Sequence, residues 1–100
     1  MLDAEIILSR LEINMNQIKS YGVEKIGLFG SFALNEQSKK SDIDLLVVFM
    51  PGKKTFDNYM GLKFFLEDLL EKPIDLVIAE AVKPALKDHI EGSVIFAQGV

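Results

Sequence analysis

Residues 30–44 read GSFALNEQSKKSDID, and this stretch decides how the rest of the chain is arranged. One apolar run ends just before its Gly-Ser pair, and a second, residues 43–49, begins beside Asp42 and carries Asp44. Side chains two residues apart in a strand point to the same face of a sheet. Asp42 and Asp44 are therefore expected on one face, about 7 Å apart at a rise of ~3.3 Å per residue.

The composition indicates a small folded domain. The chain has 100 residues, of which 49% are hydrophobic, and no cysteine, which excludes disulfides and thiolate chemistry. The apolar run 43–50 is interrupted by Asp44 and is far shorter than the ~20 residues of a membrane span. The N-terminus carries Asp3 and Glu5 rather than the layout of a signal peptide. We predict one domain over residues 1–100, a cytoplasmic location and no membrane contact.

The charge limits the kinds of partner. Fifteen acidic and eleven basic residues give a formal net charge of −4, which argues against direct binding to a nucleic-acid backbone. A nucleotide held through a cation is still compatible with this charge. Seven Phe, two Tyr and four Met are many for so small a core, so an apolar partner surface is expected, and a homodimer is left open.

The order of apolar and polar segments predicts an α/β fold, a small mixed β-sheet flanked by helices. The expected helices cover residues 3–20, 55–71 and 83–91, with a short helical turn at 32–36 and a polar loop at 36–41. The expected strands cover residues 24–29, 43–49, 74–79 and 93–97. The strand at 43–49 is apolar on both faces beyond its acidic start and is therefore predicted to be central.

Local signals give the helix ends and the buried faces. Asp3 and Thr55 are expected N-caps, Gly22 follows the first helix, and Pro84 starts the last. The residues expected to face the core are Ile7, Leu11, Met15 and Ile18 in the first helix; Phe56, Tyr59, Met60, Phe64, Leu66, Leu69 and Leu70 in the second; and Leu86 and Ile90 in the third.

The topology brings the acidic residues together. The helix at 55–71 is a crossover of the kind that joins parallel neighbouring strands, which would set Asp75 beside Asp42 and Asp44. Gly30-Ser31 reaches the same rim only if the first strand runs antiparallel to the second. A mixed sheet is therefore expected.

Three ionised carboxylates ~5 Å apart would repel one another by roughly 3 kcal/mol per pair at an effective dielectric constant near 20. Either one carboxyl keeps its proton or cations bind, and oxygen ligands of this kind favour Mg²⁺ or Mn²⁺. A glycine followed by a hydroxyl suits close approach to phosphate oxygens. Each signal alone is also typical of a turn or a solvated strand end. We interpret Lys39 and Lys40 as a solvated loop and His89 as a structural or surface residue.

Taken together, LFGS at 28–31, DIDLLVVF at 42–49 and IDLVI at 74–78 resemble the nucleotidyltransferase superfamily that includes DNA polymerase β. The chain is most similar to the minimal nucleotidyltransferase (MNT) proteins, and the resemblance extends to KPALKDHIEGSVIFA at 83–97. It implies the palm-like fold of that superfamily and magnesium-dependent transfer of AMP from ATP to a hydroxyl. It implies that Gly30 and Ser31 hold the β- and γ-phosphates, and that Asp42, Asp44 and Asp75 bind two Mg²⁺ ions and carry out catalysis.

Small MNT proteins are antitoxins of HEPN-type ribonuclease toxins, so the resemblance implies a HEPN partner whose tyrosine hydroxyl receives AMP. Two alternatives stay open: an antitoxin that neutralises by binding without catalysis, and nucleotidyl transfer to a small-molecule hydroxyl. The sequence departs from the family at Leu34-Asn35, where many members carry Arg-Gly. That arginine is a phosphate or partner contact that this chain lacks.

Overall fold

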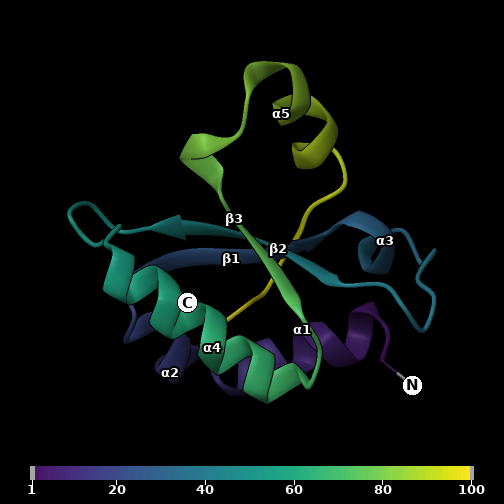
Figure 1. Ribbon diagram of the computed structural model, residues 1–100, viewed down its shortest axis with the longest axis horizontal. Helices are drawn as coiled ribbons and strands as arrows, with labels where there is room; N and C mark the ends of the chain where they lie inside the picture. The colour runs from purple at the N-terminus through teal and green to yellow at the C-terminus, as the bar shows by residue number, and fades with distance from the viewer. Residues whose placement is uncertain (1, 100) are drawn as a thin grey trace.

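The computed structural model describes residues 2–99, and Figure 1 shows the arrangement of the elements. In chain order these are α1 (Ala4–Ile13), α2 (Met15–Lys19), β1 (Val23–Phe29), α3 (Gly30–Ala33), β2 (Ile43–Phe49), α4 (Phe56–Leu70), β3 (Ile74–Ile78), the 3-10 turn η1 (Ala79–Ala81), α5 (Pro84–Glu91) and β4 (Ile95–Phe96). None of the helices within residues 2–99 has the length and apolar character needed to cross a bilayer.

The sheet is mixed, as predicted. Its strand order is β3-β2-β1-β4, with β1 antiparallel to both β2 and β4, and β2 parallel to β3. The crossover through α4 therefore joins parallel neighbours, and β2 has a strand on each side. The prediction that residues 43–49 form an inner strand is confirmed.

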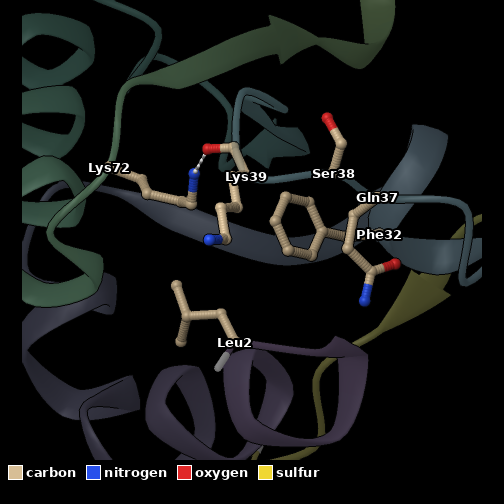
Figure 2. A pocket seen from close by; sticks show the side chains of 6 residues that line it. All are labelled: Leu2, Phe32, Gln37, Ser38, Lys39 and Lys72. Carbon is tan, nitrogen blue, oxygen red and sulfur yellow. Dashed lines mark hydrogen bonds between the residues drawn. The ribbon is translucent and has the colours of Figure 1, made fainter.

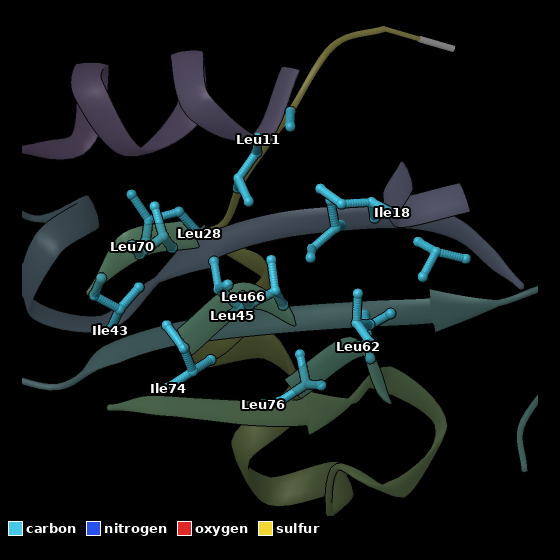
Figure 3. Packing of buried hydrophobic residues seen from close by; sticks show 14 of the residues in the cluster. Leu11, Ile18, Leu28, Ile43, Leu45, Leu62, Leu66, Leu70, Ile74 and Leu76 are labelled. Carbon is cyan, nitrogen blue, oxygen red and sulfur yellow. The ribbon is translucent and has the colours of Figure 1, made fainter. Parts of the chain in front are cut away.

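Alternation along β2 separates the two faces of the sheet. Ile43, Leu45, Val47 and Phe49 join one buried cluster with residues of α1, α2 and α4, and Figure 3 shows part of this packing. Leu46, which points to the other face, lines a small hollow with Ile90 of α5. Figure 1 accordingly shows α1, α2 and α4 on one side of the sheet and α5 on the other. Asp44 belongs to the α5 side, which the helices cover less completely.

The predicted first helix is in fact two. Its N-cap is confirmed, because Asp3 Oδ1 accepts a hydrogen bond from the Ile6 amide at 2.9 Å, and all four expected core residues are buried. The helix is interrupted at Asn14, whose backbone leaves the helical region (φ −103°, ψ 18°). The Asn14 side-chain amide donates to the Arg10 carbonyl at 2.8 Å and so competes with the backbone for the same acceptor.

The second long helix begins at its predicted cap, since Thr55 Oγ1 accepts from the Asn58 amide at 3.1 Å. Its predicted inward face was partly wrong. Phe56 is 77% and Phe64 is 59% exposed, whereas Leu62, which was not predicted to be inward, is fully buried. A helix turns 100° per residue, so a face centred on Leu62, Leu66 and Leu70 directs position 64 towards solvent.

The last helix starts at Pro84 as predicted, but Leu86 is 52% exposed and does not face the core. Ile90 is half-buried and makes the contact with the sheet near Leu46. With eight residues on the less covered face, α5 presents one apolar side chain to the sheet rather than a continuous stripe.

Candidate active site

Asp44 and Asp75 are register partners on the neighbouring parallel strands β2 and β3. Both residues alternate with core positions: Ile43 and Ile74 before them, and Leu45 and Leu76 after them, are buried. The two carboxylates therefore project together from the face opposite α4. The structure thus contains one part of the predicted geometry, Asp75 beside Asp44 at one end of the sheet.

Burial and the neighbouring acidic groups change the titration of Asp44. The pKa of Asp44 is raised from 3.8 to about 6, first because burial disfavours the charged form, then because Asp75 repels its charge and shares a hydrogen bond with it. The charge of Asp42 raises this pKa further. At neutral pH Asp44 is thus ionised against a cost that a neighbouring cation would remove.

Gly30 is held directly against Asp44. β1 ends at Phe29, which is the antiparallel register partner of Asp44, so the next residue turns over the carboxylate. Gly30 has a φ of +73°, and a Cβ built there would collide with the Asp44 carboxylate atoms. Both the backbone conformation and the space therefore require glycine.

The helical turn that follows begins earlier than predicted. α3 spans Gly30–Ala33 instead of residues 32–36, so Gly30 and Ser31 form its first turn instead of a loop before it. The Ser31 carbonyl accepts a hydrogen bond from the Glu36 amide at 2.8 Å, and Ser31 is half-buried. The α3 helix packs against β2, which keeps the Gly-Ser turn at the rim where Asp44 lies.

Asp42 lies at the entrance to β2 and is exposed. A tight turn precedes it: the Ser38 amide donates to Ser41 Oγ at 2.9 Å, and the Ser41 amide donates to the Ser38 carbonyl at 3.1 Å. Within residues 2–99, no three acidic or histidine side chains gather as a complete metal site. The structure thus brings Asp44 and Asp75 together and leaves Asp42 near enough to act on Asp44 through its charge.

The donor set nevertheless fits a divalent cation such as Mg²⁺. This ion takes one or two carboxylates and fills its other positions with water and phosphate oxygens, so it does not need a closed protein cage. The pKa of Asp44 is raised first by burial and then by the neighbouring charges of Asp75 and Asp42, and a cation bound beside these carboxylates would offset both effects. The carboxylates and the side-chain-free backbone of Gly30 together form a place for a cation and an anionic ligand.

The other residues that were discussed from the sequence lie on the surface. Lys39, Lys40 and His89 are all exposed, in agreement with their interpretation as surface residues. Asn35 has a left-handed backbone with φ 57°, a conformation in which glycine is favoured and asparagine is tolerated. Asn35 can therefore replace the glycine expected from the resemblance, whereas Leu34, 54% exposed, supplies no charge in place of arginine.

A cavity of about 230 Å³ lies on the other, helix-covered side of this end of the sheet (Figure 2). It is lined by Leu2, Phe32, Gln37, Ser38, Lys39 and Lys72, and by none of the three aspartates. Lys72 was not among the candidate functional residues predicted from the sequence. Its contacts are tertiary, and no local signal could have revealed them.

The chain is similar in sequence to known proteins. The sequence profile of the nucleotidyltransferase domain family matches residues 9–97. A candidate protein adenylyltransferase of Methanocaldococcus jannaschii, MJ0435, is 41% identical over 86 residues, 78% of this chain and 91% of that protein. Protein adenylyltransferase MntA of Thermococcus cleftensis is 32% identical over 99 residues, 96% of this chain and 97% of that protein.

Solved structures give the same picture. A candidate minimal nucleotidyltransferase superposes with a TM-score of 0.81 at 32% identity, covering 94% of this chain and 95% of that one. A toxin–antitoxin complex with AMP-PNP gives 0.70 at 22% identity, covering 89% and 73%. The complex of a tri-AMPylated HEPN toxin of Shewanella oneidensis with its MNT antitoxin gives 0.65 at 19% identity, covering 93% and 73%. The last two likenesses show the fold.

Proposed function

The chain belongs to the nucleotidyltransferase domain family, and from that premise we propose that it transfers AMP from ATP to a tyrosine hydroxyl of a HEPN-type ribonuclease toxin, acting as its antitoxin. The observation that carries the proposal is the pairing of Asp44 with Asp75 directly against Gly30, with the pKa of Asp44 raised to about 6. A like-charge pair of this kind lowers the stability of a small domain, and its presence therefore favours a functional role such as cation binding.

Gly30 and Ser31 are the proposed contacts for the β- and γ-phosphates of ATP. The absence of a side chain at Gly30 lets phosphate oxygens approach the backbone, and the Ser31 hydroxyl can donate a hydrogen bond. The complex of related fold that contains AMP-PNP supports ATP as the nucleotide.

Asp42, Asp44 and Asp75 are the proposed ligands of Mg²⁺, with two ions expected. Bound there, the metal would neutralise the charge of the phosphates and would stabilise the negative charge on the entering and leaving oxygens of an in-line displacement. The chain's own contribution is to orient the carboxylates on two adjacent strands and to keep the nucleotide at the Gly-Ser turn.

The reaction itself needs a proton acceptor. The acceptor hydroxyl oxygen forms a bond to the α-phosphorus of ATP, the bond from that phosphorus to its bridging oxygen breaks, and pyrophosphate leaves with the bonding electrons. The hydroxyl proton passes to a carboxylate, a role that we assign to Asp75. Asp75 is exposed, so an acceptor carried by a second protein can reach it.

A macromolecular acceptor fits both the charge of the chain and the names of its relatives. The net charge of −4 suits a basic, RNA-binding partner. Relatives at 32% to 41% identity are named as protein adenylyltransferases, MJ0435 as a candidate, and a HEPN toxin is the partner in the complex of related fold from Shewanella oneidensis. ATP and a ribonuclease partner both fit a cytoplasmic location.

The proposal is tested by incubating the protein with Mg²⁺, ATP labelled at the α-phosphate and a HEPN-type ribonuclease encoded beside it. We expect label on the ribonuclease, located at tyrosine by peptide mass spectrometry, and its loss with Asp44→Asn. Asp68→Asn, which removes an exposed carboxylate from α4, is the matched control and should label normally.

Equal labelling by Asp44→Asn would overturn the assignment of the site. Neutralisation of the ribonuclease without any label, and unchanged in Asp42→Ala together with Asp44→Ala, would instead favour an antitoxin that acts by binding alone. Label on small hydroxyl compounds but not on the ribonuclease would assign a different acceptor.

A further inference from the structure

Asp42, Asp44 and Asp75 form what we call the acidic rim of the sheet. Lys72 lies where the segments that carry these three residues meet. It follows the end of α4 and precedes β3, three residues before Asp75. Its Nζ donates hydrogen bonds to the carbonyls of Lys39, at 3.2 Å, and of Ser41, at 3.1 Å. Figure 2 shows the Lys72 side chain reaching the 38–41 turn at the edge of the cavity. The second carbonyl belongs to the residue immediately before Asp42.

The same ammonium group also faces the segment that carries the Gly-Ser turn. Lys72 Nζ lies 6.0 Å from the ring centroid of Phe32, which is 2% exposed and directly follows Ser31. A cation at this distance from an aromatic face is attracted to it. The Lys72 side chain thus interacts with the segments that carry Asp42 and Ser31, and Lys72 itself belongs to the segment that leads to Asp75.

The 38–41 turn has few other restraints. Its internal hydrogen bonds, between Ser38 and Ser41, close the turn on itself without joining it to the rest of the protein. Within residues 2–99, Lys72 is the side chain from outside this turn that donates hydrogen bonds to it. The regular strand contacts begin only at Ile43, whose amide donates to the Pro73 carbonyl at 3.1 Å.

We infer that Lys72 is a positioning residue for the cation site: it fixes the 38–41 turn and thereby the place of the Asp42 carboxylate relative to Asp44 and Asp75. The inference rests on the proposed function and adds a residue that does not itself touch metal or nucleotide. Groups that orient metal ligands typically change metal affinity or activity 10- to 100-fold when they are removed.

The charge of Lys72 and its hydrogen bonds have opposite effects on a cation, which makes the inference testable. Removing a positive charge near a cation site strengthens cation binding, because repulsion is lost. Removing the hydrogen bonds frees the turn and weakens binding, because Asp42 must then be ordered when the cation binds. A weaker cation affinity in a Lys72→Met variant is therefore a sign of lost positioning and not of lost charge.

The experiment is a titration of Mn²⁺ or Mg²⁺ against the thermal unfolding midpoint, on the full chain without nucleotide or partner. For Lys72→Met we expect the cation concentration that gives half of the maximal shift to rise about tenfold. Lys72→Arg, which keeps charge and donors, should restore most of the affinity. Lys40→Met removes an exposed lysine of the same turn and should bind the cation as well as wild type or better.

Hydrogen exchange gives a readout that does not involve the cation. Backbone amides of residues 38–43 should exchange faster in Lys72→Met than in wild type, while those of β1 should not change. If Lys72→Met does not fold, Lys72→Gln, whose side chain is neutral and one atom shorter, is measured in its place and should change cation binding and amide exchange in the same direction.

The outcomes separate the inference from the proposed function. A cation response in wild type that Lys72→Met leaves unchanged, or, if that variant does not fold, one that Lys72→Gln leaves unchanged, overturns the role of Lys72 alone. A wild type that shows no cation response overturns the metal site of the proposed function, and the role of Lys72 with it. A normal cation response without AMP transfer concerns only the reaction and the acceptor.

Discussion

Gly30 and Gly52 have nearly the same backbone conformation in different surroundings. Their φ angles are +73° and +76°, but a Cβ at Gly30 would collide with Asp44, whereas a Cβ at Gly52 meets nothing within 4 Å. Alanine at either position incurs the left-handed strain of ~1–2 kcal/mol. Only at Gly30 does it also displace a carboxylate of the acidic rim.

We therefore expect Gly52→Ala to lower the free energy of unfolding by about 1 kcal/mol and to leave AMP transfer intact. Gly30→Ala should lower it by a further ~1–3 kcal/mol, the usual cost of overpacking, and should abolish transfer. Urea unfolding followed by circular dichroism measures the first quantity and the labelling assay the second. Equal losses of stability in the two variants would show that the contact with Asp44 has no energetic weight.

The raised pKa of Asp44 predicts how stability depends on pH. The pKa rises from 3.8 in a solvated chain to about 6 in the fold, so between these values the folded state binds more protons than the unfolded state. Stability must then fall as the pH increases through this window and stay lower above it. Asparagine cannot ionise, so Asp44→Asn should be more stable than wild type at pH 7.5 and should lose this advantage below about pH 4.

Urea midpoints of wild type and Asp44→Asn, measured from pH 4 to pH 8 with a chelator present, provide the check. Asp68→Asn, on the exposed side of α4, is the control, and its difference in stability from wild type should not change with pH in this way. A difference between Asp44→Asn and wild type that is the same at every pH would contradict a shifted titration at this position.

At the scale of elements, α4 shows most clearly what local sequence determines. Its start depends on one side chain, because Thr55 Oγ1 caps the Asn58 amide at 3.1 Å. Thr55→Ala should destabilise the fold by about 1 kcal/mol, while Thr55→Ser, which keeps the hydroxyl, should stay within a few tenths of wild type. Thermal unfolding of the three proteins measures this. A Thr55→Ala variant as stable as wild type would mean that water replaces the cap at no cost.

The inward face of α4 was the part of the helix that sequence could not fix. Apolar residues occur on most sides of this helix, interspersed with charged ones, so hydrophobicity alone does not select the inward face: Phe56 and Phe64 fit the pattern as well as Leu62 does. The short connection through Pro73 into β3 and the packing of α4 against β3 and α1 determine the rotation of the helix. The strands were easier to predict, since apolar runs bounded by glycine and acidic residues leave little choice of length.

A pair of substitutions on α4 tests that rotation. Leu66→Ala should cost about 2–5 kcal/mol, because Leu66 is fully buried and its removal leaves a cavity. Phe64→Ala should change the free energy of unfolding by less than about 0.5 kcal/mol, because the side chain is 59% exposed. Both are read from urea unfolding. A large loss in Phe64→Ala would place this aromatic ring inside the core and reverse the assignment.

For the candidate site, too, sequence was informative about strands and silent about tertiary contacts. The crossover rule placed Asp75 beside Asp44, and the observed register agrees. It did not give the exposure of Asp42 at the entrance to β2, nor the hydrogen bonds from Lys72 to the 38–41 turn, because Lys72 and Ser41 are 31 positions apart in the sequence. The roles of Gly30, Ser31 and the three aspartates in catalysis are proposals, and the variants above test those of Gly30, Asp42 and Asp44.

At the scale of the whole molecule, the helix-covered face of the sheet stabilises the fold, whereas the acidic rim lowers its stability. Ile43 and Leu45 are buried on either side of Asp44 along β2, so a carboxylate whose ionisation is unfavourable lies on an inner strand of the sheet, between two core residues. A cation that binds the folded carboxylates, and not the unfolded chain, must therefore stabilise the entire domain.

Mg²⁺ at ten times its dissociation constant should add about 1.4 kcal/mol to the free energy of unfolding. For a domain of this size, that corresponds to a rise of roughly 6–11 °C in the unfolding midpoint. The rise should shrink below pH 6, because Asp44 then holds a proton with which the cation must compete, and it should vanish in Asp44→Asn. Differential scanning fluorimetry with Mg²⁺ and, as an ionic-strength control, Na⁺ measures it. A rise of the same size in Asp44→Asn would locate the bound cation elsewhere, because that variant keeps the fold and loses only the charge at the centre of the acidic rim.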